Sequence, residues 1–122
     1  MAFGVHHVHV KTRDPKKTME FYVNNLGATF LAEVDGRGYR VSLHGLQINI
    51  TTLIETQKRE QHHGLEHIAL DTDDYPGMLA KMRANGVRIL EELPPNANGR
   101  RVCFLEAPDG VQIEVIEAIE KK

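Results

Sequence analysis

Two alternating stretches decide the fold: Val5-His6-His7-Val8-His9-Val10 near the N-terminus, and Leu65-Glu66-His67-Ile68-Ala69 about sixty positions later. Residues two apart in a β-strand share one face, so His7 and His9 lie on one face, and Val8 and Val10 lie on the other. His7 and His67 are 60 residues apart and hold equivalent places in these stretches. Each stretch is therefore predicted to be a strand that opens one copy of an internal repeat.

A helix is predicted after each of these strands. Asp14-Pro15 is typical of an N-cap followed by proline at the first helical position, and this helix is expected from Lys16 to about Asn25. Asp74 follows Asp14 by 60 residues and opens a second helix that ends at Asn85-Gly86. Each half then continues with three shorter strands, expected at residues 29–34, 38–43 and 46–52, and at 87–90, 101–106 and 111–117.

Each half is thus a predicted βαβββ module, and the two are expected to form one domain over residues 1–122. The first module covers about residues 4–54, a linker about 55–63, and the second module about 64–118. A module of this size would bury too little apolar surface alone, so we expect the two to pair. The polar tail at 118–122 is expected to fray.

Composition excludes several classes of protein. The chain has 122 residues, 26% charged and 41% hydrophobic, which is typical of a globular domain. A net charge of −2 argues against nucleic-acid or membrane partners, and no apolar stretch is long enough to span a membrane. The N-terminus lacks the pattern of a signal peptide, and Cys103 is the single cysteine. We therefore expect a cytoplasmic protein that acts on a small molecule.

Three residues suggest a metal site. His7 and His67 open the two repeats, and Glu114 lies on the last strand of the second. A lone histidine or glutamate in a strand is more often simply a polar residue. Imidazole and carboxylate together, however, suit divalent first-row metals, and three ligands leave positions for water or substrate. A pseudo-twofold pairing of the modules would bring the two histidines close together.

The order and spacing of these motifs resemble the vicinal oxygen chelate superfamily, which includes glyoxalase I, methylmalonyl-CoA epimerase, fosfomycin resistance proteins, extradiol dioxygenases and bleomycin-binding proteins. The resemblance covers about residues 4–118 and is carried by His7-Val8-His9-Val10, Asp14, Glu20-Phe21-Tyr22, Leu26-Gly27, Gly64 to Ala69, Asn85-Gly86-Val87, Phe104, Pro108-Asp109-Gly110 and Ile113-Glu114. It implies an α+β fold, with two βαβββ modules forming a curved mixed sheet around a central metal-binding cup. It further implies that His7, His67 and Glu114 bind one divalent ion, with iron, nickel, zinc, manganese and cobalt not distinguished.

Asn49 departs from the glyoxalase I pattern. The repeat aligns Asn49 with Glu114, where the resemblance to glyoxalase I requires a carboxylate that is both a metal ligand and a general base. Our main expectation is a glyoxalase-like lyase or isomerase whose metal acts as a Lewis acid on a substrate with neighbouring oxygens. An Fe(II) extradiol-type ring-cleavage dioxygenase and a fosfomycin-type thiol transferase stay open, as does a non-catalytic protein that binds a drug or metabolite.

Other residues are predicted to support this site. His9 is expected beside the predicted metal, where it could act as an acid or base, and Asn49 is a further candidate for a catalytic or supporting residue. Either Tyr39 or Arg40 is expected to face the cavity. The residues predicted to line the substrate pocket are Gln47, Tyr39, Arg101 and Cys103. By resemblance alone, we also expect a homodimer.

Overall fold

The computed structural model describes residues 1–118, which hold two α-helices, eight strands and a short 3-10 helix. The first half contains β1 (Phe3–Lys11), α1 (Pro15–Leu26), β2 (Thr29–Val34), β3 (Gly38–Leu43) and β4 (Leu46–Thr51). The second contains β5 (Gly64–Thr72), α2 (Tyr75–Ala84), β6 (Ile89–Leu93), β7 (Val102–Glu106), the 3-10 helix Pro108–Gly110 and β8 (Gln112–Glu117). The α+β class and the two βαβββ modules are therefore confirmed. The frayed tail predicted for the C-terminus lies, from residue 119 on, outside the described residues.

Contacts divide the chain into two compact units. The first unit is His7–Glu66, and the second joins Met1–His6 to the residues from His67 on. In the first unit β1 pairs with β4 in parallel, and β4–β3 and β3–β2 are antiparallel. In the second unit β5, β8, β7 and β6 pair in the same way. In the described part of the chain, no helix has the length and apolarity that a membrane span needs.

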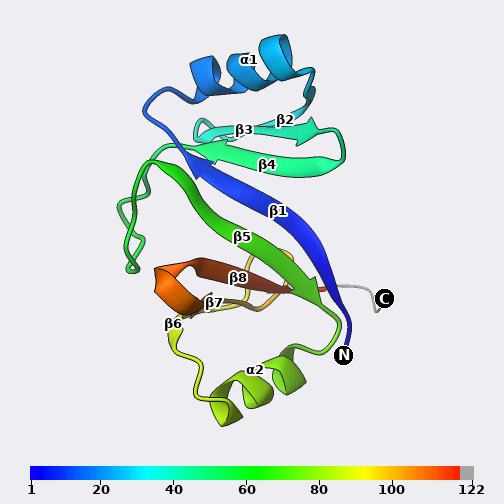
Figure 1. Ribbon diagram of the computed structural model, residues 1–122, viewed down its shortest axis with the longest axis vertical. Coiled ribbons are helices and arrows are strands. Elements are labelled where there is room, and N and C mark those ends of the chain that lie inside the picture. Colours follow the sequence, from blue (N-terminus) through cyan, green and yellow to red (C-terminus); the bar gives the residue numbers. More distant parts are fainter. Residues whose placement is uncertain (119–122) are drawn as a thin grey trace. The chain divides into compact units, whose positions relative to one another are not determined.

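Helix α1 covers one face of the first unit's sheet (Figure 1). The Asp14 side chain accepts a hydrogen bond from the backbone N–H of Lys17, which caps the helix, and Pro15 occupies its first turn. Gly27 ends the helix at φ 74°, a left-handed conformation that favours glycine. The apolar cluster beneath α1 contains Met19, Tyr22 and Val23 from the helix and Val8, Val10, Val41, Ile48 and Ile50 from the strands. The opposite face of this sheet, its helix-free face, is left for polar side chains.

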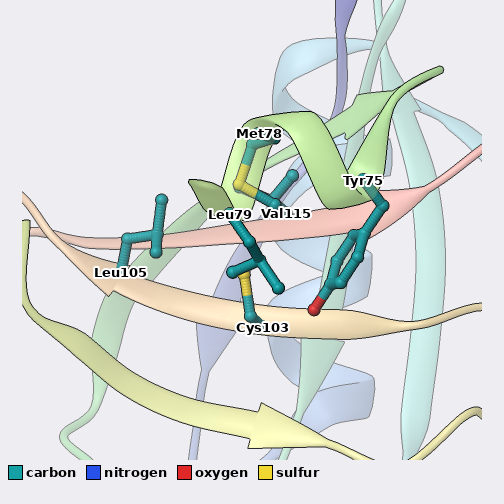
Figure 2. Packing of buried hydrophobic residues seen from close by; sticks show 6 residues of the cluster. All are labelled: Tyr75, Met78, Leu79, Cys103, Leu105 and Val115. Atoms are coloured by element: carbon teal, nitrogen blue, oxygen red, sulfur yellow. The ribbon is translucent and has the colours of Figure 1, made fainter. Parts of the chain in front are cut away.

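Helix α2 covers the second unit's sheet in the same manner. Asp74 caps it through the backbone N–H of Gly77. Figure 2 shows the cluster beneath it, in which Tyr75, Met78 and Leu79 pack against Cys103, Leu105 and Val115. The strand predicted at residues 87–90 begins later, because the Val87 N–H still bonds to the Met82 carbonyl at the helix end. That strand extends to Leu93, which pairs with Val102.

Burial of two ionisable groups beneath α2 predicts that stability falls at alkaline pH. Burial raises the pKa of both the Tyr75 hydroxyl and the Cys103 thiol above the ordinary values of 10.0 and 9.0. Stabilisation by the neutral groups is full below pH 9, and it is lost as the unfolded chain ionises at higher pH. Urea unfolding should therefore show a lower free energy at about pH 10.5 than at neutral pH. The decline should be smaller in Tyr75→Phe and unchanged in Tyr22→Phe, a control in the first unit; equal declines in all three proteins would contradict this account.

Candidate metal site and substrate face

In the second unit the structure brings His67 and Glu114 together. Strand β5 runs parallel to β8 with Ala69 opposite Glu114, which places His67 and Glu114 on the helix-free face. His67 Nε2 and Glu114 Oε1 lie 2.9 Å apart. The His67 side chain is buried, and the Phe104 ring meets it edge-on with 5.2 Å between ring centroids. Phe104 thus forms an apolar wall beside this pair of polar side chains.

In the first unit His7 and His9 share the helix-free face. Their ring centroids lie 6.2 Å apart, and His7 is buried. His9 Nε2 lies 2.8 Å from the Thr51 hydroxyl oxygen on β4, within hydrogen-bonding distance. Asn49, opposite His9 in the register, accepts a hydrogen bond of 2.9 Å from the side-chain amide of Gln47. Four of the residues predicted from the sequence therefore lie on one face of this unit.

The two units have the same register at this point. Val8 lies opposite Ile48 in the first unit, and Ile68 lies opposite Ile113 in the second. The next residue along the last strand of each pair is Asn49 or Glu114. Asn49 is therefore the structural counterpart of Glu114, as the repeat alignment predicts. The first unit has a neutral amide where the second has a carboxylate.

The donor atoms suit a divalent metal ion. In the first unit His7 and His9 each offer an imidazole nitrogen, and in the second unit His67 offers one; imidazole nitrogen is a usual ligand of divalent first-row ions. Two ligands at adjacent positions of an octahedral ion, each bonded at about 2.1 Å, lie roughly 3 Å apart. His67 Nε2 and Glu114 Oε1 are joined by a hydrogen bond of 2.9 Å, and this bond holds the two donor atoms at about that separation. The residues present therefore fit the metal that the sequence pattern suggests.

Three predicted pocket residues lie on the helix-covered faces instead. Tyr39 is opposite Ile50 and lines a pocket of about 210 Å³ at the start of α1. Cys103 is fully buried beneath α2. The Arg101 guanidinium bonds to both carboxylate oxygens of Glu117, and lies 4.9 Å from the centre of the Tyr75 ring. Only Gln47, of the four predicted pocket residues, shares a face with the histidines.

Lys11 is a buried cation that the sequence analysis did not single out. Its side chain is 1% exposed, and its Nζ has no hydrogen-bond partner among the described residues. Burial lowers the pKa of Lys11, and the charge of Glu66 opposes that shift. Glu66 itself lies 3.6 Å from the Arg59 guanidinium and accepts a hydrogen bond from Gln57. The sequence did hold one signal for Lys11. It follows His7 and His9 at intervals of two, so it is expected on the same face of β1 as these histidines.

Replacing Lys11 with methionine should stabilise the protein. Methionine has a similar volume and no charge to bury, and Glu66 keeps its contacts with Arg59 and Gln57. We expect a gain of about 1–3 kcal/mol in the free energy of unfolding at neutral pH, measured by urea denaturation. Because the lowered pKa of Lys11 favours the neutral amine, the gain should shrink as the pH rises towards 10.5. Lys17→Met, at an exposed position of α1, should change little; a loss of stability in Lys11→Met would show that the fold needs the ammonium group.

Comparisons with known proteins agree with this architecture. A family model described as the glyoxalase/bleomycin resistance protein/dioxygenase superfamily matches residues 4–115. A probable lactoylglutathione lyase of Synechocystis is 31% identical over 95% of this chain and 96% of that protein. The lactoylglutathione lyase of Escherichia coli O157:H7 is also 31% identical, over 91% of this chain and 90% of the relative.

Two solved structures extend the comparison. A hypothetical protein from Bacillus halodurans superposes with a TM-score of 0.78 at 23% identity, covering 100% of this chain and 99% of that one, which is evidence for the fold alone. Methylmalonyl-CoA epimerase from Streptomyces coelicolor superposes with a TM-score of 0.64 at 25% identity, covering 95% of this chain and 97% of the epimerase. These similar proteins include lyases and an epimerase.

Proposed function

Because this chain belongs to the glyoxalase/bleomycin resistance protein/dioxygenase superfamily, we propose that it isomerises a small thiol-derived substrate with the help of a divalent metal. Lyase or isomerase chemistry, the class expected from the sequence, is also the class that the names of its relatives give. The finer assignment is a hemithioacetal or thioester with two neighbouring oxygens as substrate. The names of the relatives support this substrate class. The observation that carries the metal dependence is the pairing of His67 with Glu114, whose donor atoms suit one metal ion.

The proposed ligands are His67, Glu114 and His7. The first two are supported by the 2.9 Å separation of their donor atoms. His7 is supported by its position as the counterpart of His67 in the repeat and by its buried imidazole. When bound, a divalent ion supplies Lewis-acid polarisation of two neighbouring substrate oxygens.

The chain's own residues then handle the proton and the substrate. Isomerisation of a hemithioacetal moves a proton from one carbon to its neighbour, and epimerisation of a thioester removes the α-proton and returns it to the opposite face of the same carbon. Both reactions need a base, and Asn49 cannot be that base because an amide is not basic at neutral pH. We assign this step to His9, which shares a strand face with His7 and is oriented by the Thr51 hydroxyl. Asn49 and Gln47 offer amide groups that can hydrogen-bond to substrate oxygens, and Phe104 excludes water beside His67.

A substrate trial tests this function. The protein is loaded with Ni²⁺ or Zn²⁺ and given the hemithioacetal of methylglyoxal and glutathione, or methylmalonyl-CoA in deuterated water. We expect either formation of lactoylglutathione or exchange of the thioester α-proton, and neither with chelator-treated protein. Failure on both substrates with fully loaded protein would reject the proposed isomerase.

A second candidate is an Fe(II) ring-cleavage dioxygenase, and Asn49 is the observation that favours it. With an amide at this position the proposed ligand set reduces to two histidines and one glutamate, the set that leaves room for a bidentate substrate and O₂. Oxygen uptake with catechols and Fe²⁺-loaded protein separates this candidate from the isomerase.

The proposal also covers the identity of the metal, the location of the protein and its oligomeric state. Elemental analysis of untagged protein purified without chelator should find about one equivalent of a divalent metal. Iron would favour the dioxygenase, whereas nickel, zinc, manganese or cobalt would favour the isomerase. A cytoplasmic location is proposed from the single cysteine, and a homodimer is proposed by resemblance; light scattering should then give twice the chain mass of 13.8 kDa.

A further inference from the structure

Arg40 and Phe104 occupy equivalent positions in the two units. Arg40 lies opposite Asn49 on the neighbouring strand, and Phe104 lies opposite Glu114. Since Asn49 is the counterpart of Glu114, Arg40 is the counterpart of Phe104. The repeat therefore carries an apolar wall in one unit and an exposed guanidinium in the other.

Arg40 belongs to the helix-free face of the first unit. The next residue pair along β3 and β4, Val41 with Ile48, is buried beneath α1, so Arg40 and Asn49 point to the other side. His9 lies opposite Asn49 on β1. These three residues form a row across β3, β4 and β1, and with strands about 4.8 Å apart the row spans roughly 10 Å.

No acidic residue is available to Arg40 along this row. Its cross-strand neighbours are Ala32 and Asn49, neither of which is charged. No described residue forms a hydrogen bond or ion pair with the Arg40 side chain. A glutamate at position 49, as at position 114, would lie directly opposite the guanidinium and pair with it. The amide instead leaves the guanidinium available for a negative group brought by a ligand.

We propose that Arg40 binds an anionic group of the substrate, a carboxylate or a phosphate, and so restricts the site to anionic substrates. This inference rests on the proposed function and specifies its substrate class. A guanidinium is suited to the role because it can donate two parallel hydrogen bonds to either group and stays charged at all relevant pH values. Glutathione adducts would supply a carboxylate, and coenzyme A thioesters a phosphate.

Binding measurements without added metal test Arg40 separately from catalysis. Calorimetry is run with S-methylglutathione, its diethyl ester and acetyl-CoA, on the original protein and on Arg40→Gln. If S-methylglutathione or acetyl-CoA binds the original protein, we expect Arg40→Gln to bind the same ligand about 10- to 100-fold more weakly. The ester should bind both proteins equally, because it has lost the carboxylates. Arg13→Gln, which removes an exposed arginine that follows β1, is the matched control and should bind as the original protein does.

A chemical readout separates failure of this inference from failure of the proposed function. Phenylglyoxal modifies exposed arginines, and mass spectrometry reports whether a ligand protects Arg40. If a thiol adduct binds the original protein and Arg40→Gln equally, the inference is overturned and the proposed function stands. If neither thiol adduct binds, the proposed substrate class fails, and inorganic phosphate becomes the deciding probe. Protection of Arg40 by phosphate supports the inference, and no protection overturns it.

Discussion

Glu114→Gln should abolish stoichiometric metal binding while the protein stays folded. Glutamine keeps the volume of the side chain and can still hydrogen-bond to His67, but its neutral amide oxygen is a poor ligand for a divalent ion. Loss of an outer partner alone lowers metal affinity by about 10- to 100-fold, so we expect loss of a direct ligand to exceed about 100-fold. Catalytic activity should fall in proportion to the amount of metal that the variant retains. Elemental analysis after dialysis against a metal buffer gives the affinity directly.

Thermal unfolding supplies a second readout of the same ligand. Metal that binds only the folded state raises the melting temperature, so added Zn²⁺ should stabilise the original protein and not Glu114→Gln. Glu106→Gln, which removes a half-buried carboxylate at the end of β7, is the control and should keep its metal. Asn49→Glu tests the counterpart position, where a new carboxylate should raise affinity if that side chain reaches the ion. Full metal content in Glu114→Gln would show that the ligand assignment is wrong.

The repeat made most of the fold predictable from the sequence. Offsets of 60 residues between His7 and His67, and of 65 between Asn49 and Glu114, predicted equivalent positions, and the structure gives the two units the same register there. Helix starts followed from Asp14 and Asp74, because a side chain that caps the first backbone N–H groups leaves a local signature.

It was harder to predict which face of the sheet a strand residue occupies. Tyr39 and Arg40 are adjacent, and only the register with β4 decides which of them shares a face with Asn49. The irregularity between Phe30 and Ala32 in β2 adds a local shift that composition does not reveal. Lys11 was missed for another reason. Strand parity places it on the helix-free face, but its burial near the charges of Glu66 and Arg59 depends on tertiary packing.

His9→Gln should lower kcat by about 10²- to 10⁴-fold, the usual contribution of a residue that transfers a proton. Glutamine can still bond to the Thr51 hydroxyl, so packing at β1 and β4 is kept while the ability to accept a proton is lost. Metal content should stay near that of the original protein, which separates this role from that of a ligand. Thr51→Val, which leaves the imidazole in place without its hydrogen-bond partner, should lose far less, about 10-fold.

The assignment of the proton transfer to His9 requires that His9→Gln lose kcat and at the same time keep its metal. Deuterium exchange at the reacting carbon should fall with kcat, because both depend on the same proton transfer, whereas KM should change little. Loss of metal in His9→Gln would instead make His9 a ligand, which its imidazole also allows. Unchanged exchange with retained metal would leave the proton step to a different residue, and Asn49, as an amide, could not be that residue.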